Sequence, residues 1–200
     1  MTPARLAILV LASAIAGCAV GPRTELREVV DGPATIAPAV DTVAVVAIAQ
    51  DPAVRGEWEA AFAARLSSAG VRVAAAGRSR GGAAPGGEAA DGGAVLEAAR
   101  AAGAQAIVFV QPPSDVPIAP GQGAYRWMDA RSAPDLRGLL DDASTAVTEV
   151  RLVDLRPGLA TWHAYVLTVY PGKRGADPRN AADAVAKGLA GRGYLRGGTR

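Results

Sequence analysis

The chain has 200 residues, and its 21 Lys and Arg against 19 Asp and Glu give a net charge of only +2. A balance this close to zero does not indicate a nucleic-acid-binding protein, which needs a strong positive field. Cys18 is the only cysteine, so no intramolecular disulfide can form and a hydrophobic core must hold the fold.

Residues 1–17 are predicted to be a signal peptide. Arg5 precedes an apolar run that starts at Leu6 and ends on small residues. The run is too short for a transmembrane helix, which needs roughly 20 apolar residues. Its last four residues resemble the lipobox of bacterial lipoproteins: Ile15, Ala16, Gly17 and Cys18.

The lipobox resemblance implies a lipid anchor on Cys18. In such lipoproteins the cysteine receives a diacylglycerol, the peptide is cut before it, and the new amine takes a further acyl chain such as palmitate. Position 19 is Ala and not Asp, the residue that usually retains Gram-negative lipoproteins in the inner membrane. The resemblance therefore implies an outer-membrane protein that faces the periplasm.

Residues 18–41, after the signal peptide, are expected to be the acylated N-terminus and a flexible tether that lifts the domain off the membrane. The pairs Gly21-Pro22 and Gly32-Pro33 disfavour regular structure there. Residues 42–195 are predicted to form a single α/β periplasmic domain, and residues 196–200 a disordered tail.

A β-α-β unit is predicted at the start of the domain. Residues 42–49 form an apolar run typical of a buried strand, and Asp51-Pro52 is a helix-start signal. Trp58, Phe62 and Leu66 recur at helical spacing and are expected in the core. Gly70 ends the helix, and residues 71–74 form a second strand, parallel to the first.

Two low-complexity or Pro-rich segments are expected to be flexible loops. Residues 77–93 come before a short helix, residues 94–102, and a third buried strand, residues 104–110. Residues 111–144 make a long loop with a possible short helix near residues 133–142. At its centre are residue types that anchor interfaces, so we expect partner contact, or alternatively packing within the loop, at Tyr125, Arg126, Trp127 and Met128.

A β-hairpin and a final helix complete the predicted domain. Residues 145–155 alternate, with Thr148, Val150 and Leu152 on one face and Glu149 and Arg151 on the other. Residues 159–170 form the second strand, which carries Trp162 and His163, so one of these two side chains faces the core. The pair Asp177-Pro178 starts the helix, its apolar stripe includes Val185 and Leu189, and Gly193 ends it.

The predicted order is β-α-β-α-β-β-β-α, an α/β (α+β) fold with one mixed sheet of about five strands packed by helices. This layout resembles small proteobacterial envelope lipoproteins, among them CsgG, LpoB and the N-terminal domain of TolB. The resemblance is carried by packing patterns over most of the mature chain: 41–49, 64–73, 99–110, 149–166 and 181–195. It implies a non-catalytic domain that binds an envelope partner or its own copies.

An alternative is a small envelope serine hydrolase. Residues 77–81, Gly-Arg-Ser-Arg-Gly, fit the G-x-S-x-G pattern, and Asp141 or Asp154 with His163 could complete a triad around Ser79. The helix that should follow the serine is missing, because residues 82–87 read Gly-Ala-Ala-Pro-Gly-Gly. A glycan- or lipid-binding domain is a third possibility.

Neither a metal nor a cofactor is expected. His163 is the only histidine, so no His-x-x-x-His pair exists, and no calcium-loop pattern is present. We expect His163 to be a structural or exposed residue. The sequence therefore predicts no catalytic residue and no enzyme activity.

Overall fold

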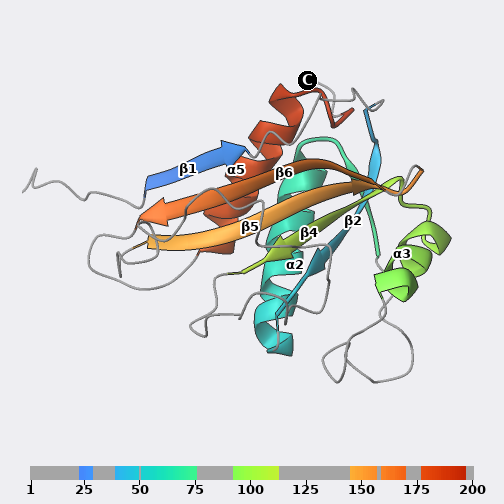
Figure 1. Ribbon diagram of the computed structural model, residues 1–200, viewed down its shortest axis with the longest axis horizontal. Helices are drawn as coiled ribbons and strands as arrows, with labels where there is room; N and C mark the ends of the chain where they lie inside the picture. The colour runs from blue at the N-terminus through green and yellow to red at the C-terminus, as the bar shows by residue number, and fades with distance from the viewer. Residues whose placement is uncertain are drawn as a thin grey trace, which may run out of the picture.

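The computed structural model describes residues 23–28, 39–49, 51–75, 92–112, 145–156, 159–169 and 177–196. These residues form one mixed sheet of six strands in the order β1-β6-β5-β4-β2-β3, packed by three helices (Figure 1). The elements in chain order are β1 (Arg23–Glu28), β2 (Thr42–Ala47), α2 (Pro52–Ser68), β3 (Arg72–Ala74), α3 (Gly92–Ala101), β4 (Ala106–Gln111), β5 (Thr145–Asp154), β6 (Leu159–Val169) and α5 (Pro178–Gly191).

The predicted β-α-β unit is confirmed. β2 pairs in parallel with both β3 and β4, so the first three predicted strands run in one direction. The side chain of Asp51 caps α2 by accepting a hydrogen bond from the Ala53 amide at 2.7 Å. Gly70 follows the helix with a φ of 86°, which a residue with a Cβ rarely adopts.

The main core lies between the sheet and the α2–α5 pair, which stand side by side behind the strands in Figure 1. Trp58, Phe62 and Leu66 of α2 are buried there, as predicted. Val185 and Leu189 of α5 join them from the other helix. An ion pair between Arg65 and Asp183, 2.7 Å apart, links the two helices at their half-exposed surface.

α3 packs on the opposite face of the sheet, at one end. Ala99 of α3 belongs to a second, smaller apolar cluster with Ala44, Ile107 and Val153 from the strands. Gly92 and Gly93, predicted in the loop 77–93, belong to α3, and Gln111, predicted in the loop 111–144, belongs to β4.

β1 is the main departure from the prediction. Residues 23–28 lie within the range expected to be a flexible tether, but they pair antiparallel with β6, from Arg23 opposite Val169 to Glu28 opposite Ala164. The tether prediction is wrong for these residues, and the sheet has six strands and not five. The physical reason is that β6 has 11 residues and offers β1 a full ladder of backbone partners.

The domain also extends past both predicted boundaries. The backbone amide of Val40 donates to the Tyr194 carbonyl at 2.8 Å, and that of Arg196 donates to the Val40 carbonyl at 2.8 Å. The two segments form a parallel bridge between Val40 and Leu195. Residues 39–41 and Arg196 therefore belong to the folded unit.

Several predictions lie outside the described residues. They concern the signal peptide 1–17, the lipobox with Cys18, the G-x-S-x-G segment, the contact residues Tyr125 to Met128 and the short helix near 133–142. Of the helices that are described, none is both long enough and apolar enough to cross a membrane.

Candidate functional site

A group of polar side chains lies on the face of the sheet that carries α3, but on the β5–β6 half. We call Glu149, Arg151, His163 and Tyr165 the polar cluster. Glu149 is directly opposite Tyr165, and Arg151 is directly opposite His163, in the β5–β6 register. Directly opposite residues share a face of the sheet, so the four side chains are neighbours.

The polar cluster is buried although three of its members can carry charge. Arg151 and His163 are each 7% exposed and Tyr165 is 3% exposed. The side chain of Glu149 is 17% exposed. Buried ionisable groups of this kind persist only when they are paired with one another.

A single carboxylate oxygen joins the charged members. Glu149 Oε1 accepts a hydrogen bond from Arg151 Nε at 2.8 Å. The same oxygen lies 2.9 Å from His163 Nε2, a contact that becomes an ion pair when the imidazole is protonated. The His163 ring packs against the Tyr165 ring, with 5.0 Å between the ring centroids and 59° between the ring planes.

These contacts set the ionisation of Glu149. Burial raises the pKa of its carboxyl, but the contact with His163 and the positive charge of Arg151 together lower it by more. The net pKa is below the ordinary value, so Glu149 is a carboxylate at neutral pH. Its negative charge offsets the Arg151 guanidinium inside the protein.

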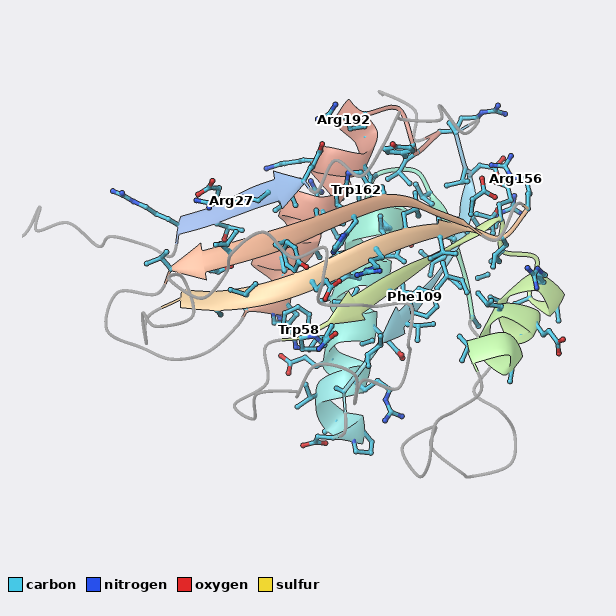
Figure 2. All side chains as sticks on the ribbon, viewed as in Figure 1. Arg27, Trp58, Phe109, Arg156, Trp162 and Arg192 are labelled. Carbon is cyan, nitrogen blue, oxygen red and sulfur yellow. The ribbon has the colours of Figure 1, made fainter. Side chains whose placement is uncertain are left out.

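Asp154 does not join His163 in the catalytic triad that the hydrolase alternative requires. Asp154 is opposite Ala106, which belongs to the α2–α5 core, whereas His163 is on the other face of the sheet. Asp154 Oδ1 instead accepts hydrogen bonds from the Arg156 amide and Nε, each at 2.9 Å. Arg156 lies at the β5–β6 turn, at the end of the sheet away from Arg27 of β1 (Figure 2).

The interaction with Arg156 also changes the pKa of Asp154. The hydrogen bond from the Arg156 side chain lowers the pKa of Asp154, and this outweighs the opposing effect of burial. Asp154 therefore acts as a turn-fixing carboxylate. Ser79 and Asp141, the remaining candidates for that triad, lie outside the described residues.

The sequence placed two members of the polar cluster, Glu149 and Arg151, but did not bring them together with His163 and Tyr165. The alternation along β5 predicted that Glu149 and Arg151 share a face, and this is confirmed. His163 is buried, which fits the structural one of its two expected roles, structural or exposed. The usable signal was an E-x-R pattern in one strand of the predicted hairpin and an H-x-Y pattern in the other. Across the described ranges, no three His, Cys, Asp or Glu side chains come together as a metal-binding group.

The sequence matches no protein-family model and no curated protein. Among solved structures, a singly substituted PelC dodecamer from Paraburkholderia phytofirmans is similar, with a TM-score of 0.46 and 16% identity, over 88% of this chain and 100% of that one. A second PelC dodecamer from the same organism has a TM-score of 0.44 and 17% identity, over 87% and 99% of the two chains.

Lipoprotein GNA1162 from Neisseria meningitidis has a TM-score of 0.42 and 19% identity, over 76% of this chain and 95% of that one. All three TM-scores are below 0.5, so these likenesses assign no function to this chain. The resemblance to CsgG, LpoB and TolB stays a prediction.

Proposed function

We propose that this protein is a lipoprotein of the Gram-negative cell envelope, anchored to the outer membrane through Cys18 and facing the periplasm. One observation carries the proposal: the charged residue, apolar run and lipobox-like end of residues 5–18. Acylation of this kind gives stable anchoring, because each buried methylene contributes about 0.8 kcal/mol and two or more chains act together.

The proposed role of the domain is non-catalytic binding or assembly, with an envelope protein or further copies of the chain as partner. The environment of His163 supports this role. Its ring contacts Glu149 and Tyr165 within the buried polar cluster, and Asp154 is on the other face of the sheet. The proposed contact residues are Tyr125, Arg126, Trp127 and Met128.

The anchor is tested by metabolic labelling with palmitate, followed by separation of inner and outer membranes. The wild-type protein should incorporate label and sediment with the outer membrane, and Cys18→Ser should do neither. Ala19→Asp keeps the acylated cysteine and should move the protein to the inner membrane. Label retained by Cys18→Ser would refute the anchor, and an unchanged membrane fraction in Ala19→Asp would refute the outer-membrane assignment.

The binding role is tested by cross-linking in intact cells, with a tag at the C-terminus. A reproducible partner, or a ladder of this chain with itself, is the expected result. Replacing Tyr125 and Trp127 by Ala should weaken that complex without changing the thermal midpoint of unfolding. The matched control replaces Trp58, a core residue, by Phe, which should lower the midpoint and leave the cross-links in place. Cross-links that persist in the Tyr125/Trp127 variant would exclude this contact surface.

A further inference from the structure

The distance along the chain between Cys18 and β1 is very short. β1 begins at Arg23, so only four residues separate the two. An extended chain rises roughly 3.3–3.6 Å per residue, so the Cα atom of Arg23 lies at most about 18 Å from that of Cys18, whatever the conformation between them. Whatever holds Cys18 must therefore hold the start of β1 nearby.

β1 is firmly attached to the rest of the domain. All six of its residues pair with β6. Leu26 packs closely over Gly188 of α5, where a Cβ would overlap the Leu26 side chain. Glu28 pairs with Arg192, which Figure 2 shows at the C-terminal end of α5. The position of β1 thus fixes the position of the whole domain.

The surface at the start of β1 suits a lipid headgroup layer. Arg23, Glu25 and Arg27 are exposed on one face of the strand. Arg27 pairs with Glu25 at 2.9 Å, so Arg23, at the start of the strand, is the cation that the short segment after Cys18 keeps near the anchor. Val169, directly opposite Arg23, is 41% exposed and is the exposed large hydrophobic residue of the described part of the chain. An apolar side chain beside a cation matches the chemistry of the membrane interface.

We propose that the domain lies directly against the lipid surface, with the β1 edge and the Arg23–Val169 corner facing the headgroups. This inference rests on the proposed function, because it requires acylation of Cys18. β3, at the other edge of the six-stranded sheet, then faces away from the membrane. Adjacent strands are about 4.8 Å apart, so the two edges differ in height by up to about 24 Å.

The test compares fluorophores at the two edges of the sheet. Glu25→Cys and Arg72→Cys place a thiol at exposed positions of β1 and β3 on the same face of the sheet. The full-length acylated protein is labelled and reconstituted into vesicles of phosphatidylethanolamine and phosphatidylglycerol that contain a headgroup spin-labelled lipid. Because the edges differ in height by several strand spacings, quenching at position 25 should be roughly threefold stronger than at position 72.

A second variant controls for differences between the fluorophores at the two positions, because it changes the distance from the anchor and keeps the label at position 25. Ten Gly and Ser residues inserted between Pro22 and Arg23 add a root-mean-square reach of about 17 Å. Quenching at position 25 should then fall to the level at position 72. Equal quenching at the two positions in the uninserted protein would overturn the proposal. Energy transfer between fluorophores at position 25 of different copies, without quenching by the lipid, would assign the β1 edge to a second copy and also overturn it.

Failure of the anchor is distinguishable from failure of this orientation. Cys18 is the only native cysteine, so an acylated chain with one introduced cysteine takes one label. A chain with two labels that remains outside the vesicles would refute acylation of Cys18, and the orientation with it. A chain with one label that sediments with the vesicles but shows equal quenching would refute the orientation alone.

Discussion

The two faces of the sheet are held by different kinds of interaction, although the same strands supply both. The face toward α2 and α5 is covered by apolar side chains, and its largest buried residues include Phe62, Leu66 and Leu189. The other face is apolar beneath α3 and polar on the β5–β6 half, where Glu149 joins Arg151 and His163.

The difference predicts how each face tolerates change. Apolar packing is non-directional, so a substitution that conserves volume is usually absorbed. The polar cluster is held by contacts between charged side chains, so a substitution that removes one charge also removes that residue's attraction to the others. The free energy of unfolding should therefore depend on side-chain size for substitutions on the first face, and on side-chain charge for substitutions on the second.

The largest effect is expected from Phe62→Ala. Phe62 is fully buried against the α2–α5 face, so its truncation should lower the free energy of unfolding by about 4 kcal/mol. Phe62→Leu conserves most of the volume and should cost less than about 1.5 kcal/mol. Urea denaturation monitored by circular dichroism measures both, and equal losses in the two variants would contradict size as the determining property.

Glu149→Gln should come next, with a loss of about 3 kcal/mol, although the two side chains are nearly equal in volume. The reason is that Gln lacks the negative charge that Glu149 Oε1 presents to Arg151 Nε at 2.8 Å. Glu25→Gln is the matched control, because Glu25 pairs with Arg27 at the surface, where such a pair is worth less than about 1 kcal/mol. Similar losses in the two variants would show that burial of the pair is unimportant.

Two carboxyl groups, Glu149 on the polar face and Asp154 on the opposite face, should also make the protein sensitive to acid. The pKa values of Glu149 and Asp154 lie below their ordinary values of 4.5 and 3.8. Their contribution to stability is therefore complete above those ordinary values and is lost as the pH falls through the lower pKa values of the folded state.

This acid sensitivity can be measured as the urea midpoint between pH 6 and pH 2. The midpoint should fall most steeply below pH 4.5, and the slope should be smaller in Glu149→Gln. A slope unchanged by that substitution would exclude Glu149 as a source of the acid response.

The smallest effect is expected at the start of α2, outside both faces. Asp51 Oδ1 accepts a hydrogen bond from the Ala53 amide, so Asp51→Ala should lower the free energy of unfolding by about 1 kcal/mol. Asp51→Asn retains a side-chain oxygen that can accept this bond, so its free energy of unfolding should stay close to that of the wild type. Thermal denaturation of the two variants tests this. A larger loss in the Asn variant than in the Ala variant would argue against the cap.

The sequence predicted the elements with strong local signals. β2 and β4 are apolar runs, and α2 and α5 each begin at an Asp-Pro pair whose Asp accepts an amide hydrogen bond. β1 was missed because its residues, Arg-Thr-Glu-Leu-Arg-Glu, contain a single large apolar side chain and read as a polar tether. Its strand conformation depends on β6 and Gly188, which are remote in the sequence.

The polar cluster was half predictable for a related reason. Alternation identified the face of Glu149 and Arg151, but their meeting with His163 depends on the register of the hairpin. That register shifts at an irregularity between Leu152 and Val153, and no local sequence pattern predicts this shift.

The pairing of β1 with β6 also constrains the order in which the chain can fold. The hydroxyl oxygens of Thr24 and Thr168 are 3.4 Å apart across these strands, yet the two residues are 144 positions apart in the sequence. During synthesis β1 is made early, and it cannot form its pairing until β6 has also been made. Such a non-local contact closes late and slows folding. The first strand of this sheet in the sequence therefore cannot take its place until the last strand has formed.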